Sequence, residues 1–440
     1  MLSAEDEAGP ENQAAEEVVG RGGSRTRCGS APSCALRYNG AMPSPSAPSI
    51  SSVARRVQDV AGPVAVFFLR SAAQVRAAGD DACVFVAGDP QQNAPARSVE
   101  ALARAATPER PDWFAYTQSA PSAQEAAAAS LRKRLGVPFR AEDVLLTNAS
   151  LAALVVAFRT LLEPGDEVIM IQPPHFCYEM LIVAAGGTAV RVPVDPQSQD
   201  LDTAAIARAI TPRTRIVVVN TPHNPTGKIF GPETLTRLAA VLTEASRAYG
   251  PVILLSDEAY SRIVFSGSTF TSPAAFYPYT IVVYSYGKQL LAPGQRIGYL
   301  ALHPDMPGID ELRYSLMMSQ LVAGWAWPNA LLQHAVSDLE QFDVDMIGLE
   351  KRRDRVVSAL RAMGYEDVSL PEATFYITAK SPIADDEAFV EMLARENVFV
   401  LPGKLLEMPG TFRISLTGTD AMVERALPRF ESVLAQAKAQ

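Results

Sequence analysis

The stretch I-V-V-Y-S-Y-G-K-Q-L-L-A-P-G-Q-R-I-G-Y, residues 281–299, holds the features that decide the fold and the chemistry of this chain. It opens with a β-branched run typical of a buried strand and then reaches one lysine, Lys288, among small and polar residues. A lysine at the end of an apolar strand is costly to bury unless it is used, so Lys288 is a candidate Schiff-base nucleophile. Ser285 and Arg296 flank it as a hydroxyl donor and a planar guanidinium, which together suit a phosphate. The stretch suggests an aldehyde cofactor with a phosphate group, and an ordinary surface hairpin is an equal alternative from these residues alone.

The composition indicates a globular protein and excludes several partners. Of the 440 residues, 48% are hydrophobic and 20% are charged, and this length favours two domains. The formal net charge of −9 argues against nucleic acid and anionic membranes as main partners. No apolar run near the N-terminus is long enough to cross a bilayer, and no secretory leader is visible. The four cysteines are scattered without CxxC spacing, which favours a reduced, cytoplasmic setting without a metal site.

The chain divides by composition and pattern into four predicted parts. Residues 1–45 lack apolar periodicity and are predicted to be disordered, and Met42 is a candidate for the true start. Residues 46–125 are expected to contribute to a small domain and to dimer contacts. Residues 126–325 are expected to form a large cofactor-binding domain, and residues 326–440 a small C-terminal domain.

Apolar periodicity predicts the secondary structure of these parts. Seven short apolar strands alternate with helices in the large domain, which predicts an α/β fold with a mostly parallel sheet, and the C-terminal pattern predicts a smaller α+β domain. One helix is expected over residues 51–77 with a break near Gly62-Pro63, and one long helix over residues 329–363. Ligands of such sheets bind at the carboxyl ends of the strands, where the polar residues discussed below are expected to lie.

Two motifs follow neighbouring buried strands. The sequence N-P-T-G at residues 224–227 fixes an irregular loop in which Asn224 presents an amide at the end of a strand. The sequence D-E-A-Y at residues 257–260 begins with Asp257, an aspartate that leaves an apolar strand and therefore favours a permanent cationic partner. A protonated pyridine nitrogen would supply that charge, and Tyr260 could donate a hydrogen bond to a phenolic oxygen of the same ring. Taken alone, Asp257 is better explained as a helix N-cap.

A third motif, T-N-A-S-L at residues 147–151, joins a strand to a helix. The free backbone N–H groups at a helix start, together with the Ser150 hydroxyl, form a suitable phosphate site. Many strand–helix turns share this pattern.

Taken together, these pieces resemble the class I/II aminotransferases, enzymes of fold type I that use pyridoxal 5′-phosphate (PLP). The resemblance runs from about residue 51 to the C-terminus. Its carriers are N-P-T-G at 224–227, D-E-A-Y at 257–260, S-Y-G-K at 285–288, P-G-Q-R-I-G-Y at 293–299 and F-R-I-S at 412–415.

The resemblance implies a role for each matching residue in catalysis or in binding the cofactor ring. Lys288 would form the aldimine with PLP and carry the proton between the substrate Cα and the cofactor. Asp257 would pair with the pyridine nitrogen, while Asn224 and Tyr260 would bond the ring oxygen. Such an enzyme transfers the amino group of an L-amino acid to a 2-oxo acid, with 2-oxoglutarate as the expected acceptor.

The resemblance also implies residues that hold the phosphate and the substrate. The phosphate ligands would be Ser285, Arg296, Ala149, Ser150 and, from a partner subunit, Tyr116, which implies a homodimer with a shared active site. Arg413 would bind the substrate α-carboxylate, and Gly88 would lie where the N-terminal segment closes over the substrate.

One position departs from the family pattern and leaves two alternatives open. In Q-P-P-H-F-C-Y, residues 172–178, His175 stands where an aromatic ring usually stacks on PLP, and Phe176 could take that role after a one-residue shift. The histidine motivates a second hypothesis, a fold-type I enzyme of specialised biosynthesis that performs elimination, oxidation or C–C bond formation. A third hypothesis, a PLP-sensing regulator, ranks far behind because residues 1–45 show no helix–turn–helix pattern.

Overall fold

The computed structural model describes residues 49–91 and 94–439. The predicted disordered extension over residues 1–45 and the question of a start at Met42 lie outside the described residues. Within the described ranges, no helix combines the length and the apolar character needed to span a membrane.

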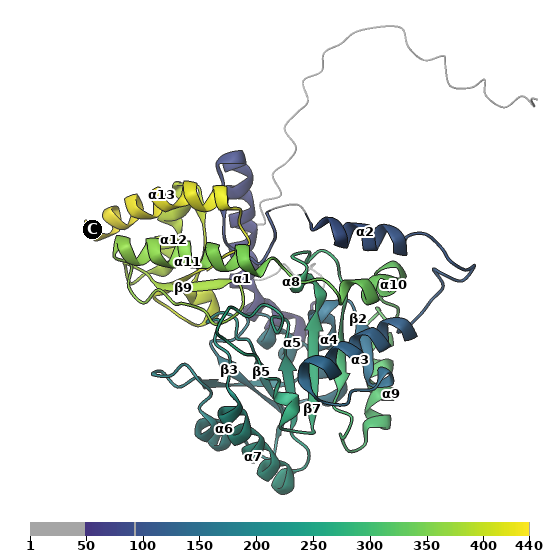
Figure 1. The fold of residues 1–440 in the computed structure, drawn as a ribbon. Helices are drawn as coiled ribbons and strands as arrows, with labels where there is room; N and C mark the ends of the chain where they lie inside the picture. The colour runs from purple at the N-terminus through teal and green to yellow at the C-terminus, as the bar shows by residue number, and fades with distance from the viewer. Residues whose placement is uncertain (1–48, 92–93, 440) are drawn as a thin grey trace, which may run out of the picture. The chain divides into compact units, whose positions relative to one another are not determined.

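The central element is a seven-stranded sheet with the strand order β2-β8-β7-β6-β5-β3-β4 (Figure 1). Strand β8 runs antiparallel to both of its neighbours, and the remaining strands are parallel to one another. The prediction of a mostly parallel seven-stranded sheet in an α/β fold is confirmed. The strands are β2 (Val144–Thr147), β3 (Glu167–Gln172), β4 (Thr188–Pro193), β5 (Thr214–Asn220), β6 (Ile253–Asp257), β7 (Thr280–Ser285) and β8 (Gly298–Leu302).

Helices cover both faces of this sheet because its strands are apolar on both sides. One face packs against α4 (Ala149–Leu161), α5 (Tyr178–Ala184) and α9 (Ile309–Val322). The other face packs against α2 (Ala96–Ala105), α3 (Pro121–Leu135) and α10 (Ala330–Leu339) near β2, and against α6 (Thr203–Ala209) and α7 (Pro232–Tyr249) near β4. Alternate residues of each strand therefore enter different cores.

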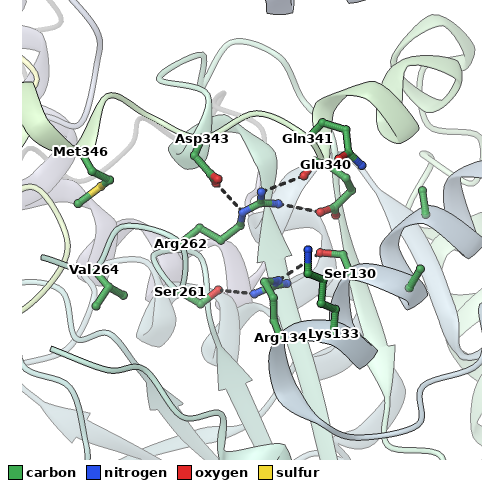
Figure 2. Close-up of a pocket in the computed structure, with 12 residues that line it drawn as sticks. Ser130, Lys133, Arg134, Ser261, Arg262, Val264, Glu340, Gln341, Asp343 and Met346 are labelled. Atoms are coloured by element: carbon green, nitrogen blue, oxygen red, sulfur yellow. Dashed lines mark hydrogen bonds and ion pairs between the residues drawn. The ribbon is translucent and has the colours of Figure 1, made fainter. Parts of the chain in front are cut away.

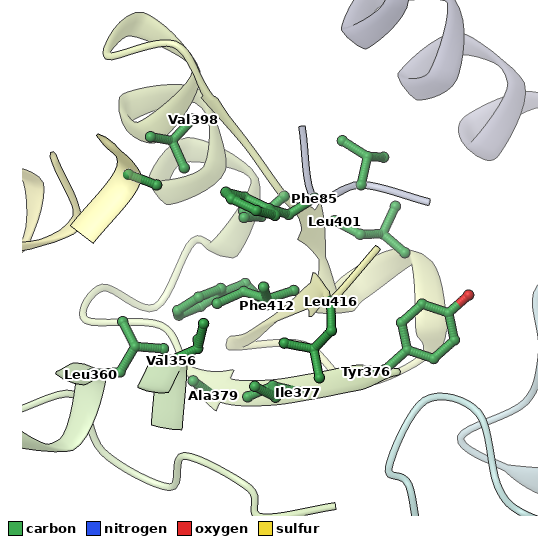
Figure 3. Packing of buried hydrophobic residues seen from close by; sticks show 14 of the residues in the cluster. Phe85, Val356, Leu360, Tyr376, Ile377, Ala379, Val398, Leu401, Phe412 and Leu416 are labelled. Atoms are coloured by element: carbon green, nitrogen blue, oxygen red, sulfur yellow. The ribbon is translucent and has the colours of Figure 1, made fainter. Parts of the chain in front are cut away.

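The C-terminal part is a smaller α+β unit around a three-stranded antiparallel sheet with the order β11-β12-β9. Figure 3 shows its core, in which Phe412 and Phe85 pack with aliphatic residues from several elements. Phe85 directly follows β1, which pairs with β10, so the N-terminal segment joins this unit. Its elements are β1 (Cys83–Val84), α11 (Met346–Met363), β9 (Tyr376–Lys380), α12 (Asp386–Arg395), β10 (Val398–Phe399), β11 (Leu401–Pro402), β12 (Thr411–Ser415) and α13 (Asp420–Lys438).

Two helix predictions were wrong. Helix α1 (Ser52–Ala78) continues through Gly62-Pro63 instead of breaking there. Pro63 is solvent-exposed, and the packing of the Phe68 ring on Phe176 at 5.8 Å ties the following turns to the sheet domain, so tertiary contacts outweigh the lost N–H.

The predicted helix over residues 329–363 is two helices, α10 and α11, joined by a linker. Asp345 caps the second helix by accepting a hydrogen bond from the Gly348 N–H at 3.0 Å. The linker residues Glu340 and Asp343 both bind Arg262, which holds the linker out of helical conformation. Helices α2, α9 and the short α8 (Tyr286–Gln289) were not predicted.

Candidate active site

The carboxyl ends of β5, β6 and β7 lie side by side and carry Asn220, Asp257 and Ser285. Asn220 and Asp257 are register partners, and the Asn220 amide donates to the Asp257 carbonyl at 2.9 Å. The Asn220 side-chain oxygen accepts from the backbone N–H of Asn224 at 2.8 Å. One asparagine thus fixes the N-P-T-G loop to the strand that ends in Asp257.

Asp257 is buried and has a tyrosine as its side-chain partner. The Tyr178 hydroxyl donates to Asp257 Oδ2 at 2.6 Å, and the Ala259 N–H approaches Oδ1 at 3.3 Å. Burial raises the pKa of the Asp257 carboxyl, and the hydrogen bond from Tyr178 opposes that rise. No helix follows β6 directly, so the N-cap interpretation of Asp257 does not apply.

Lys288 lies on α8, immediately after β7, and faces aromatic rings. Its Nζ is 5.9 Å from the ring centroids of both Tyr260 and Phe375. The hydroxyls of Tyr260 and Tyr376 are 3.2 Å apart, and burial raises the pKa of Tyr260 well above its ordinary value. The Tyr260 phenol is therefore a neutral hydrogen-bond donor next to the lysine.

Arg413 is a buried cation, with 2% of its surface exposed. Its Nη1 donates to Asn224 Oδ1 at 2.8 Å and its Nη2 to the Val86 carbonyl at 3.1 Å, while its Nε has no hydrogen-bond partner among the described residues. Its Cζ lies 3.9 Å from the ring centroid of Tyr376. Burial lowers the pKa of Arg413, because its partners are neutral and leave the charge uncompensated.

Gly88 lies close to this arginine in the segment that follows β1. A Cβ at Gly88 would be 2.5 Å from Phe375 Cε2 and 2.9 Å from the Tyr376 hydroxyl, so no side chain fits there. The predicted closure of this segment over a substrate stays a prediction, and the segment does contact the Arg413 side chain through Val86.

His175 and Phe176 differ in what they face. Their rings stack on each other at 4.6 Å, but Phe176 also packs against Phe68 of α1. Burial, together with the nearby cations of Lys288 and Arg413, lowers the pKa of His175 to about 3. A neutral imidazole thus faces the candidate site, whereas the phenylalanine faces the helix behind it.

The proposed phosphate site is formed by the start of α4 and the pair of β7 with β8. A Cβ at Gly298 would lie 2.9 Å from Ala149 Cα and 3.2 Å from Ser285 Cα, so these backbones approach closely. Ala149 adopts a left-handed conformation with φ 66°, and the helix start that continues with Ser150 has no side-chain cap. Backbone N–H groups therefore remain free at this point.

Arg296 and Tyr116 complete the predicted set and are more exposed. Arg296 donates to the Pro293 carbonyl at 2.6 Å and lines a cavity of about 540 Å³ with Asn148 and Trp327. Tyr116 is 85% exposed and packs its ring against Trp327 at 4.8 Å. The assignment of Tyr116 to a partner's site stays a prediction.

Sequence reasoning missed four residues at this site. Tyr178 and Asn220 bind Asp257, and Tyr376 contacts both Tyr260 and Arg413. The fourth, His223, lies between Thr226 Oγ1 at 2.8 Å and the Pro173 carbonyl at 3.0 Å, and burial lowers its pKa to about 4. Asn220 ends β5, and Tyr178 closes the segment Q-P-P-H-F-C-Y that begins at the end of β3, so their places after apolar strands could have indicated them. No local pattern indicated Tyr376.

The residues present fit PLP. The narrow backbone approach at Gly298 and the uncapped start of α4 suit its phosphate, and the buried Asp257 suits its ring nitrogen. The unpartnered Nε of Arg413 suits the carboxylate of an amino acid. Among the residues that the structure describes, no group of three His, Cys, Asp or Glu side chains could hold a metal ion.

Comparisons with known proteins agree with this geometry. The family model "Aminotransferase class I and II" matches residues 82–430. The chain is 31% identical over 394 residues to the aspartate/prephenate aminotransferase of Thermus thermophilus, covering 88% of this chain and 99% of that protein. It is 29% identical over 361 residues to the valine–pyruvate aminotransferase of Mycobacterium tuberculosis, covering 79% of this chain and 90% of that protein.

A solved structure shows the same architecture. The crystal structure of an aminotransferase from Eubacterium rectale superposes with a TM-score of 0.78 at 26% sequence identity, covering 88% of this chain and 96% of that one.

Proposed function

The chain belongs to the class I and II aminotransferases, and on this premise we propose that it transfers the amino group of an L-amino acid to 2-oxoglutarate on bound PLP. The observation that carries the proposal is the buried Arg413, whose charge has neutral partners and whose Nε has none. A substrate α-carboxylate supplies the missing anion and can take two N–H donors of one guanidinium. The named relatives act on different amino acids, so the family alone does not fix the donor.

The ring of the cofactor is held by side chains from three strand ends. When bound, PLP supplies a carbonyl that condenses with amines and a ring that accepts an electron pair. Asp257, which Tyr178 orients by its hydrogen bond, would keep the ring nitrogen protonated. Asn224 and Tyr260 would donate to the ring oxygen, and His175 would cover the ring face.

Lys288 moves the proton that the reaction requires. Its Nζ lies 5.9 Å from the ring centroids of Tyr260 and Phe375. With PLP and an amino acid bound, the free amine of Lys288 would be the group that accepts the proton from the substrate Cα and returns it. Arg413 contributes by orienting the Cα–H bond toward Nζ.

The start of α4, together with Ser285 and Arg296, would bind the phosphate. This helix start has no side-chain cap, so the N–H groups of Ala149 and Ser150 would be available to an anion at the positive end of the helix dipole. Tyr116 of a second copy adds a hydroxyl, which makes the active enzyme a homodimer. The exposure of the Tyr116 ring on the single chain supports this role. Cytoplasmic location stays a prediction.

The test is a half-reaction on the full-length, PLP-loaded protein. Single amino acids are added without any oxo acid, the absorbance of the bound cofactor is followed, and products are identified by mass spectrometry. We expect the absorbance band to disappear with one donor class, one 2-oxo acid to form per subunit, and 2-oxoglutarate to restore the band. Ammonia release or oxygen uptake in place of an oxo acid would contradict the proposal.

A substitution at Arg413 separates substrate binding from cofactor binding. Arg413→Gln should leave the cofactor absorbance intact and raise the donor concentration needed for half conversion by roughly 10- to 100-fold, because a charged hydrogen bond is lost. Arg355→Gln is the matched control, since Arg355 is exposed and pairs with Glu424 away from the site.

A further inference from the structure

A second cavity, of about 600 Å³, lies apart from the residues of the candidate active site (Figure 2). Three segments form it: the C-terminal half of α3, the segment that follows Tyr260, and the linker between α10 and α11. Its polar and charged lining residues are Ser130, Lys133, Arg134, Ser261, Arg262, Glu340, Gln341 and Asp343.

Arg262 forms ion pairs with both carboxylates that line the cavity. It binds Glu340 at 2.7 Å and Asp343 at 2.8 Å, and it also donates to the Glu340 carbonyl at 2.9 Å. The other Glu340 oxygen accepts from the Tyr286 hydroxyl at 2.5 Å. Figure 2 shows the contacts of Arg262 with Glu340 and Asp343 on one wall of the cavity. Both carboxylates therefore have Arg262 as their direct ionic partner, and neither forms an ion pair with another described cation.

Two further cations of the cavity, Arg134 and the exposed Lys133, have no direct ion-pair partner among the described residues. Arg134 is partly buried and donates to neutral hydroxyls of Ser130 at 3.2 Å, Ser261 at 3.3 Å and Tyr299 at 3.4 Å. These distances exceed the ~2.7–2.9 Å of a charge-assisted bond to a carboxylate. In residues 49–91 and 94–439, neither Arg134 nor Lys133 forms an ion pair. Glu340 and Glu258 act on Arg134 only at longer range and raise its pKa, so an anion in the cavity would supply the direct charge-assisted contact that the guanidinium lacks.

We propose that this cavity binds a small anion, a phosphate or carboxylate compound, through Arg134 and Lys133. The planar guanidinium of Arg134 can donate two parallel hydrogen bonds, and Lys133 adds a flexible ammonium at the opening. The hydroxyls of Ser130 and Ser261 lie within reach of the same anion. A volume of about 600 Å³ suits a metabolite-sized ligand.

The position of the cavity connects this anion to the catalytic residues. Ser261 and Arg262 directly follow Tyr260, and Val264 forms a β-bridge with Ala373, two residues before Phe375. The linker on the other wall joins the sheet domain to the unit that carries Arg413. We therefore expect the bound anion to change the KM for the amino donor. This effect rests on the proposed function, whereas binding itself does not.

The test measures binding to the full-length, PLP-loaded protein by isothermal titration calorimetry. Inorganic phosphate and malonate are the two probes, with sodium chloride at equal ionic strength as the reference, so the two chemistries are distinguished. Lys133→Gln should weaken binding by about tenfold or more, because one charged contact is lost. Arg132→Gln is the matched control: Arg132 lies on the same helix, pairs with Glu125 and does not line the cavity.

A second variant addresses the guanidinium. Arg134→Lys keeps the charge and loses the two parallel donors, and its fold is checked by circular dichroism. We expect weaker binding of both probes and no change for Arg132→Gln. Absence of saturable binding in the wild type, or equal affinity in wild type, Lys133→Gln and Arg134→Lys, overturns the proposal, because such binding belongs to the active site. If no amino acid is transaminated, the calorimetric arm still decides whether the anion binds.

Discussion

Asp257 and Glu258 are consecutive buried acids at the end of β6, and they serve opposite sides of the sheet. Asp257 faces Tyr178 and Lys288, whereas Glu258 shares a face with Ser256, whose hydroxyl donates to it at 3.0 Å. Within the part of the chain that the structure describes, Glu258 Oε2 has no hydrogen-bond partner. Burial raises the pKa of both carboxyls. Burial alone therefore does not identify a catalytic acid, because the groups next to each carboxylate decide its role.

Among substitutions on the two sides of the sheet, we expect the replacement of Lys288 to cause the largest loss of activity. Lys288→Ala should abolish transamination and the cofactor absorbance band of the bound protein, because no other residue at the site carries an amine that can move the Cα proton. Turnover is measured with saturating donor and acceptor. Lys404→Ala serves as control, since Lys404 is exposed and pairs with Glu387. Unchanged turnover in Lys288→Ala would refute the assignment of the whole site.

The two acids should respond differently to neutralisation. Asp257→Asn should lower kcat/KM by roughly 10²- to 10⁴-fold, since the ring nitrogen then loses the group that keeps it protonated. Glu258→Gln should lower it by less than about tenfold, because that side chain faces away from the site and keeps its acceptor oxygen for serine. Equal losses in both variants would show that the two faces are not functionally distinct.

Stability against pH sharpens the same comparison from the Glu258 side. Burial raises the pKa of Glu258 from 4.5 to about 7, so the folded protein holds a proton that the unfolded chain releases between these values. This contribution to stability is present below pH 4.5 and is lost as the pH rises through about 7.

Glu258→Gln removes this dependence. Between pH 5 and 8 the wild type should lose up to about 3 kcal/mol of unfolding free energy relative to the variant. Urea unfolding of the PLP-free protein at both pH values, at one protein concentration, measures the difference. Parallel pH dependence in the two proteins would mean that Glu258 is ionised in the fold.

A substitution at Tyr178 tests whether its hydroxyl lowers the pKa of Asp257. Tyr178→Phe keeps the ring and removes the hydroxyl that donates at 2.6 Å, so the pKa of Asp257 should rise further and the acid limb of the kcat/KM profile should move to higher pH. We expect a loss of about tenfold in kcat/KM near neutral pH. Tyr365→Phe is the control, since its hydroxyl donates to the Phe430 carbonyl away from the site. If the pH profile of kcat/KM does not shift in Tyr178→Phe, then Tyr178 contributes only by packing.

The sequence predicted what local patterns encode. Strand–helix alternation predicted the sheet, and the strand-end motifs placed Lys288, Asp257 and Asn224 where the structure brings them together. It did not predict contacts between distant segments, such as Tyr178 with Asp257, 79 residues apart, or Tyr376 with Tyr260, 116 residues apart. The same limit explains the helix errors, because contacts of Arg262 with the linker decide where α10 ends. The domain boundaries and the partner role of Tyr116 stay predictions.

The smallest expected effect concerns backbone strain, which differs between the proposed phosphate site and the anion cavity. Ala149, at the proposed phosphate site, has φ 66°, whereas none of the residues lining the anion cavity has a left-handed backbone. Ala149→Gly removes about 1–2 kcal/mol of left-handed strain and adds up to about 1 kcal/mol of unfolded-state entropy, so the PLP-free protein should gain up to about 1 kcal/mol. Ala153→Gly, in the same helix and fully buried, should instead lose about 1 kcal/mol or more. Opposite signs in urea unfolding of the two variants are the expected result, and a loss in both would mean that the Ala149 methyl group stabilises the fold more than its conformation strains it.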